Sequence, residues 1–91
     1  MTELRLYSRQ GCCLCEGLEQ RLRSLELSEI DLDLEVVDID APTTPERLRA
    51  LYDLEVPVLA LAGTELPRVS PRLVGDALRH WLLSCLADRQ H

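Results

Sequence analysis

The chain has 91 residues, of which 46% are hydrophobic, and this length suits a single domain with one core. Phe is absent, so we expect the core to consist mainly of Leu, Val, Ile and Ala. The formal net charge is −6, and all ten basic residues are arginine. This charge argues against non-specific nucleic-acid binding and against a polybasic membrane surface, because both depend on excess positive charge.

No segment reaches the apolar length of a membrane span, and the N-terminal residues lack the basic-then-apolar order of a signal peptide. We therefore expect a cytoplasmic protein without a membrane partner, and a monomer. In that compartment, clustered cysteines are more often catalytic, redox-sensing or metal-binding than structural.

The first half of the chain predicts a strand, a helix and a second strand. Residues 4–7 alternate between apolar and polar positions and precede a turn at 8–11. A helix is expected over about 13–25, with one apolar stripe made of Leu14, Leu18, Leu22 and Leu25. A second, largely buried strand is expected over about 34–39.

A short helix and a third strand follow. Thr44 and Pro45 form a typical N-cap and first helical position, which predicts a helix ending at Tyr52. Residues 56–61 are apolar and predict a strand. Pro57 cannot donate a ladder hydrogen bond, so it must lie near the start of this strand or at an edge.

The remaining residues predict a hairpin and a final helix. A turn at 62–65 leads into a short fourth strand at 66–69. Ser70 and Pro71 repeat the cap-then-proline pattern, so the last helix is expected to begin there and to extend to about Ala87. The predicted order is βαβαββα, an α/β fold whose first βαβ unit is parallel and right-handed.

Three of the four cysteines lie within four residues, Cys12, Cys13 and Cys15, between the first strand and the first helix. Unsatisfied N–H groups and the helix dipole at this N-terminus favour the thiolate of Cys12. Cys15 follows about one helical turn later, close enough to attack a mixed disulfide on Cys12. The spacing therefore indicates thiol–disulfide exchange.

Residues 7–15 resemble the active-site segment Tyr-Ser-Lys-x-x-Cys-Pro-Tyr-Cys of the glutaredoxin family, which has the thioredoxin fold. This resemblance implies a four-stranded mixed sheet with helices on both faces, over a single domain at 1–91. It makes Cys12 the nucleophile and Cys15 the resolving cysteine. It also implies that Arg9 takes the position of the basic residue that binds a glutathione carboxylate.

The segment Glu55-Val56-Pro57 is similar to the family's Thr-Val-Pro segment. The resemblance implies a cis peptide bond at Pro57 and main-chain hydrogen bonds from Val56 to glutathione. These positions make glutathione a candidate reductant or mixed-disulfide substrate, besides a disulfide-containing protein. No tightly bound cofactor is expected.

The chain departs from the family in two places. Cys13-Leu14 replaces Pro-Tyr between the cysteines, and the Gly-Gly-x-x-Asp segment that binds glutathione before the last helix has no counterpart. Gly75 and Asp76 are expected inside the last helix, too late to replace that segment. We therefore expect glutathione to bind weakly.

Two other functions stay open. The cluster of Cys12, Cys13 and Cys15 could hold an iron–sulfur or zinc centre, although further zinc ligands are few, namely Cys85, His80 and His91. The chain could also be a redox-inert adaptor with a thioredoxin fold. Cys13 is a third thiol, a ligand or a passive small residue.

Overall fold

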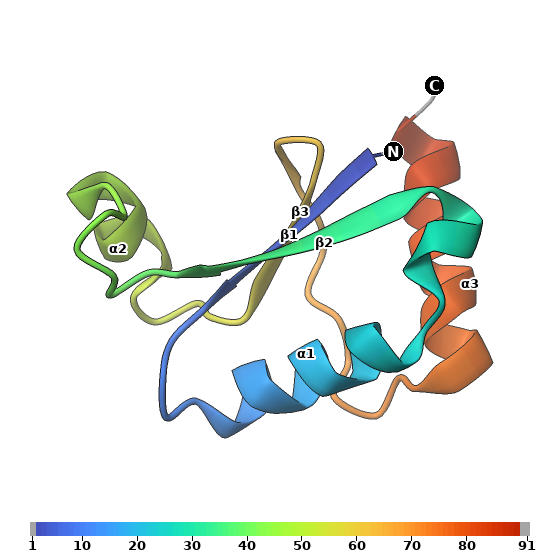
Figure 1. The fold of residues 1–91 in the computed structure, drawn as a ribbon, viewed down its shortest axis with the longest axis horizontal. Helices are drawn as coiled ribbons and strands as arrows, with labels where there is room; N and C mark the ends of the chain where they lie inside the picture. Colours follow the sequence, from blue (N-terminus) through green and yellow to red (C-terminus); the bar gives the residue numbers. More distant parts are fainter. Residues whose placement is uncertain (1, 90–91) are drawn as a thin grey trace.

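The computed structural model describes residues 2–89, and within them four strands and three α-helices alternate in the predicted order (Figure 1). The elements are β1 at Thr2–Ser8, α1 at Cys13–Ser24, β2 at Leu32–Asp38, α2 at Glu46–Tyr52, β3 at Val58–Leu61, β4 at Thr64–Glu65 and α3 at Gly75–Arg89. A short 3-10 helix, η1 at Leu27–Ile30, follows α1. None of the helices in this described part is long and apolar enough to cross a membrane.

The strands form one mixed sheet in the order β2-β1-β3-β4. β1 runs parallel to β2, with Thr2 opposite Leu32, and antiparallel to β3, with Leu6 opposite Leu59. The predicted α/β class and four-stranded mixed sheet are therefore confirmed. The carboxyl ends of β1 and β2 lie together, so the turns that follow these two strands meet at one edge of the sheet.

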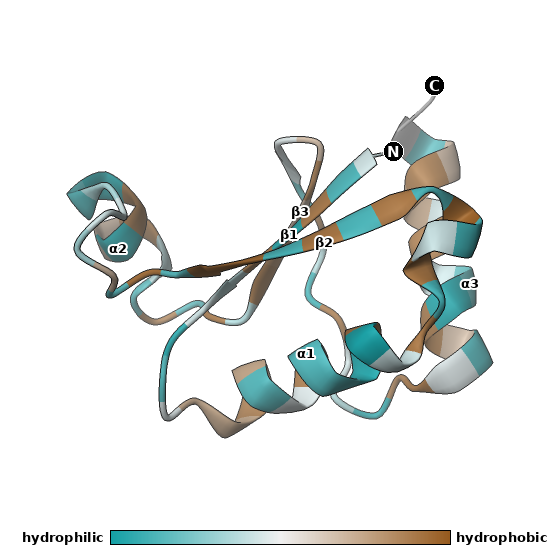
Figure 2. Ribbon diagram, viewed as in Figure 1, coloured by the Kyte–Doolittle hydropathy of each residue, from teal (hydrophilic) through white to brown (hydrophobic). Residues whose placement is uncertain are grey.

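Helices cover both faces of the sheet. Successive side chains of a strand point to opposite sides, so both faces carry apolar side chains that the helices bury. Leu4 and Leu6 of β1 belong to the core cluster that faces α1 and α3, whereas Tyr7 packs with Tyr52 of α2. The two tyrosine rings are stacked, with centroids 4.7 Å apart. Figure 2 shows the brown, apolar stretches on the strands between the helices.

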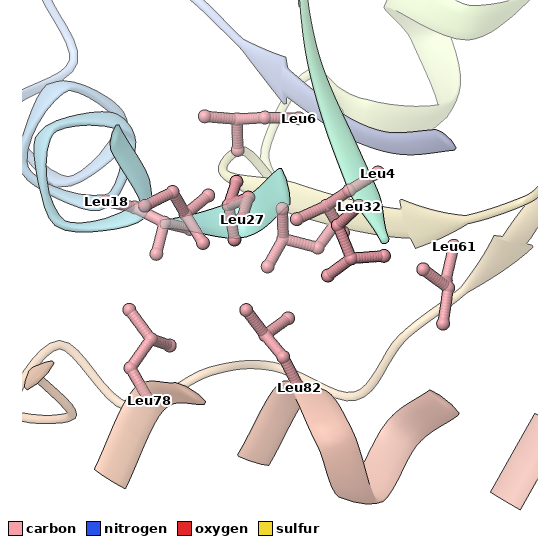
Figure 3. Close-up of a cluster of buried hydrophobic side chains, with 10 residues drawn as sticks. Leu4, Leu6, Leu18, Leu27, Leu32, Leu61, Leu78 and Leu82 are labelled. Atoms are coloured by element: carbon pink, nitrogen blue, oxygen red, sulfur yellow. The ribbon is translucent and has the colours of Figure 1, made fainter. Parts of the chain in front are cut away.

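The larger core cluster is built almost entirely of leucine (Figure 3). Leu78 and Leu82 point from α3 toward Leu18 of α1 and toward the strand side chains. Leu18, Leu78 and Leu82 are each at most 1% exposed. Burial of one leucine contributes roughly 1.5–3 kcal/mol, so this cluster holds α1 and α3 against the sheet.

Two predicted boundaries shift in the middle of the chain. β2 begins at Leu32 rather than at residue 34, because Leu32 is buried opposite the start of β1. α2 begins at Glu46 with Pro45 as its N-cap, and no side chain caps it. The prediction of Thr44 as the N-cap was wrong, since its hydroxyl donates instead to the carbonyl of Asp38 at 2.6 Å.

The hairpin is tighter than predicted. Ala62 and Gly63 have φ angles of 48° and 87°, the left-handed pair that a two-residue turn requires. β4 therefore begins at Thr64 and comprises only two residues, so the fourth strand expected at 66–69 was wrong. Pro67, which has no N–H, ends any continuation of the ladder.

The last helix begins later than predicted. Ser70 and Pro71 form a turn in which the Ser70 hydroxyl accepts from the N–H of Arg72 at 3.2 Å. α3 begins only at Gly75, whose φ angle of 55° no continuous helix contains. Residues 66–74 therefore form an irregular segment that leads from β4 along α1 to α3 (Figure 1).

Candidate active site

The N-terminus of α1 presents the cysteine pair. Cys12 is the N-cap residue, with extended backbone angles, and its Sγ atom accepts a hydrogen bond from the backbone N–H of Cys15 at 3.2 Å. The two residues form a disulfide, with their Cα atoms 5.2 Å apart. The sulfur of Cys12 thus takes the place that a Ser or Asp oxygen occupies in an ordinary N-cap, where negative charge is favoured.

The cysteines differ in access to solvent. Cys12 is partly exposed, whereas Cys15 is only 2% exposed and belongs to the core side of α1. Cys13 is a free, exposed thiol. Cys85 on α3 is partly buried, and burial, with a smaller effect of Asp88, raises the pKa of its thiol. Of the two paired sulfurs, only that of Cys12 is open to an incoming partner.

The segment before β3 lies next to this turn. The peptide bond between Val56 and Pro57 is cis, as the resemblance implied. Pro57 and Leu14, which stands between the two cysteines, line one open hollow of about 110 Å³ together with Val69. The structure therefore brings the cysteine turn, the cis proline and residues 66–74 to one surface.

The main chain beside the cis proline is already hydrogen-bonded on one side. The N–H of Val56 donates to the carbonyl of Tyr52 at 3.2 Å. Arg68 donates to the carbonyl of Glu55 at 2.9 Å and to its carboxylate at 3.1 Å. Among residues 2–89, no hydrogen bond to the carbonyl of Val56 is found outside the helices and strands.

Arg9 is held by two carboxylates from distant parts of the chain. Its guanidinium donates to both oxygens of Asp40, at 2.7 and 3.2 Å, and to the carboxylate of Asp53 at 2.6 Å. A fourth hydrogen bond, of 2.9 Å, reaches the carbonyl of Asp53. These hydrogen bonds raise the pKa of Arg9, and the Arg9 contact lowers the pKa of Asp40. The sequence patterns assigned no role to Asp40 or Asp53.

The start of α3 lies away from the cysteines. Gly75 and Asp76 open the helix, so the expectation that they lie inside it was wrong. Arg21, in the second half of α1, donates to the carbonyls of Ser70 and Leu73 at 3.2 and 2.6 Å. These contacts place the residues just before α3 along the far half of α1, and Figure 1 shows α3 beginning near the end of that helix.

Among residues 2–89, no three His, Cys, Asp or Glu side chains are grouped so that they could hold a metal ion. His80 is exposed on α3, and Cys85 packs against the core cluster. The remaining candidate ligand, His91, lies outside the described residues.

Comparison with known proteins gives both a family and structural neighbours. The model of the glutaredoxin-like domain (DUF836) matches residues 3–83. No curated protein matches the sequence. A mutant thioredoxin from Halobacterium salinarum superposes with a TM-score of 0.57 at 26% identity, over 91% of this chain and 73% of that one.

Two further solved structures have a similar fold. A Northeast Structural Genomics target protein from X. campestris gives a TM-score of 0.52 at 29% identity, over 89% of this chain and 96% of that one. Thioredoxin O2 from Arabidopsis thaliana, in its oxidised state, gives a TM-score of 0.57 at 18% identity, over 91% of this chain and 71% of that one. The fold expected from the resemblance, thioredoxin-like, is confirmed.

Proposed function

We propose a thiol–disulfide oxidoreductase, and two grounds support this function. The chain belongs to the glutaredoxin-like domain (DUF836) family. In addition, its Cys12–Cys15 pair lies at a helix N-terminus, with Cys12 partly exposed and Cys15 buried. The second ground carries the proposal, because exchange needs one accessible, stabilised thiolate and one sheltered partner.

The reaction has two steps. The thiolate of Cys12 attacks one sulfur of a substrate disulfide, forms a mixed disulfide and releases the other substrate sulfur. Cys15 then attacks the sulfur of Cys12, which forms the Cys12–Cys15 disulfide and releases the second substrate thiol. Two electrons and two protons pass from the cysteine pair to the substrate. An external thiol must then reduce the bridge before the next turnover.

The substrate we propose is a disulfide in another protein, reduced in the cytoplasm. Leu14 is 57% exposed between the two cysteines, and it lines an open hollow with Pro57 and Val69. Apolar side chains around a reactive sulfur suit contact with a protein surface. A cytoplasmic location accords with a cysteine pair that must be reduced to act.

Glutathione is proposed as a weak ligand, in contact with Arg9, Val56 and Pro57 where it binds. The Arg9 guanidinium already makes four hydrogen bonds to aspartates, and the N–H of Val56 is bonded to Tyr52. A glutathione carboxylate would have to compete for the cation. Activity in a glutathione-coupled assay should therefore be low, and a robust activity that is lost in Arg9→Ala would contradict this proposal.

The function is tested by disulfide reduction with dithiothreitol as the electron source. The unmodified protein should accelerate the reduction of a protein disulfide, and Cys12→Ser should abolish the acceleration. Cys15→Ser should instead accumulate a mixed disulfide between Cys12 and the substrate, visible by mass spectrometry without reductant, because nothing resolves it.

Cys13→Ala is the matched control, since this exposed thiol lies next to Cys12 but does not pair. We expect it to retain nearly full activity. If Cys12→Ser and Cys15→Ser behave identically, the two-step mechanism is wrong. A loss in Cys13→Ala as large as in Cys12→Ser would instead support a ligand role for the cluster.

A further inference from the structure

Arg9, Asp40 and Asp53 form a charge cluster that joins three loops. Arg9 follows β1, Asp40 follows β2 and Asp53 follows α2, and the ion pairs measure 2.7 Å to Asp40 and 2.6 Å to Asp53. A guanidinium has five N–H bonds, and this one makes four hydrogen bonds within the cluster. The guanidinium of Arg49 also lies 3.8 Å from Asp40, so with this second cation the group of two arginines and two aspartates carries no net charge.

The cluster adjoins the disulfide. The carbonyl of Arg9 accepts from the N–H of Cys12 at 3.3 Å, so Arg9 belongs to the turn that presents the sulfur. Arg9 and Cys15 also line one open hollow of about 220 Å³. The hollow is lined by Ser8, Arg9, Gln10, Cys15, Glu16, Glu19 and Asp38. Arg9 is its only cationic lining residue, and three others are carboxylates, of which Glu19 is paired with Arg23 at 2.9 Å while Glu16 and Asp38 have no ion pair within residues 2–89.

We propose that Asp40 and Asp53 determine the charge specificity of the exchange site by occupying the Arg9 guanidinium. With its only cation neutralised, the surface beside Cys15 is anionic and slows thiols or disulfides that carry negative charge. This inference rests on the proposed disulfide exchange. In this proposal, two aspartates that lie outside the cysteine turn determine which reductant reacts, according to the charge of the reductant.

The test follows reduction of the Cys12–Cys15 disulfide by three small thiols of different net charge. The thiolate attacks the sulfur of Cys12, the bridge breaks, and Cys15 leaves with the electron pair and takes up a proton. A second thiol then releases Cys12 and forms the small disulfide. The attacking thiolate carries a net charge of −2 in glutathione, −1 in 2-mercaptoethanol and 0 in cysteamine, so the ratio of their rates reports the local field.

The main variant is Asp40→Asn with Asp53→Asn. We expect the ratio of the glutathione rate to the 2-mercaptoethanol rate to rise roughly 3- to 10-fold, since exposed charges interact weakly one by one. The cysteamine ratio should fall. Because each ratio is compared between proteins, the intrinsic reactivity of each thiol cancels. 2-Mercaptoethanol is the common reference, so a general change in the accessibility of the disulfide cancels in both ratios.

The matched control removes two carboxylates elsewhere, Asp33→Asn with Asp88→Asn. Asp33 is exposed at the opposite end of β2, and Asp88 is exposed near the end of α3. The overall charge changes equally, so a local effect should leave its ratio within about 2-fold of the unmodified protein. Equal ratios in the control and the main variant would overturn the proposal.

Two more measurements bear on the proposal. Adding Arg9→Gln to the main variant should abolish the gain, and a gain that persists would show that Arg9 is not its cause. In the unmodified protein, salt should raise the glutathione rate and lower the cysteamine rate, each relative to the 2-mercaptoethanol rate, because it screens exposed charge. Rate ratios independent of salt would overturn the proposal without any variant. If 2-mercaptoethanol reduces the bridge but Cys12→Ser stays active on substrate, the proposed function fails instead.

Discussion

The backbone N–H of Cys15 donates a hydrogen bond to the Sγ atom of Cys12 at 3.2 Å. A donor aimed at a sulfur stabilises its thiolate more than its thiol, because hydrogen bonds to charged groups are the stronger ones. In the proposed reaction, Cys15 therefore has two roles: its sulfur resolves the mixed disulfide, and its backbone N–H stabilises the thiolate of Cys12. The backbone contribution depends only on Cys12 being the N-cap residue.

In the reduced protein, we expect iodoacetamide near neutral pH to modify Cys12 before the other cysteines. The helix N-terminus favours its thiolate, which is the reacting form. Cys85 should react more slowly than the exposed Cys13, because burial raises the pKa of the Cys85 thiol. Peptide mass mapping over time gives the order. Faster labelling of exposed Cys13 would assign the nucleophile to that residue.

Truncation of Leu78 to alanine should lower the free energy of unfolding by about 2–5 kcal/mol. Leu78 is fully buried in the leucine cluster between α3 and the sheet. Leu83→Ala is the control, because it lies on the same helix but is 39% exposed. Leu83→Ala should lower the free energy of unfolding far less than Leu78→Ala. Urea unfolding measures the loss in both variants, and similar losses would contradict the assignment of the core.

Substitution of two glycines by alanine should change the stability of the protein in opposite directions. Gly17 lies inside α1, and a Cβ atom added there would meet open space, so Gly17→Ala should stabilise the protein by up to about 1 kcal/mol. Gly63 has a φ angle of 87° in the hairpin turn, so Gly63→Ala should destabilise it. Thermal unfolding distinguishes the two. If both substitutions shift the thermal unfolding midpoint in the same direction, helix propensity and turn geometry are not the causes of the two effects.

The ion pair of Asp40 should stabilise the fold in a pH-dependent way. Arg9 lowers the pKa of Asp40 in the folded state. The resulting stability is therefore complete above the unfolded-state pKa of about 3.9 and is lost as the pH falls through the lowered value. The difference in unfolding free energy between the unmodified protein and Asp40→Asn should shrink as the pH falls below about 4.

Urea titrations between pH 7 and pH 2.5 measure that difference. In an Arg9→Gln background, the pH-dependent effect of Asp40→Asn should be smaller, because only Arg49, 3.8 Å from Asp40, then still lowers the pKa of that carboxylate. A difference that stays constant with pH, or that is undiminished without Arg9, would mean that the ion pair of Arg9 and Asp40 does not stabilise the fold.

Local sequence patterns determined most of the fold. The leucine spacing along α1 and the alternation along β1 were sufficient to predict both elements, because each pattern repeats with the period of its backbone. Their buried faces were predicted only in part, since Leu14 of the expected stripe is 57% exposed and Tyr7 is buried. The Cys12 and Cys15 spacing likewise predicted the pairing at the helix N-terminus. Elements set by neighbouring residues can be read from the sequence because their geometry is regular.

The start of α3 and the partners of Arg9 were decided by tertiary structure. Ser70 and Pro71 are typical residues of a helix start, yet α3 begins only at Gly75. Arg21 instead donates hydrogen bonds to the carbonyls of Ser70 and Leu73, which precede the helix. Arg9 meets Asp40 and Asp53, which are 31 and 44 residues away, only because the ends of β1, β2 and α2 converge. A side chain's partner across such distances depends on chain topology, and no local periodicity encodes it.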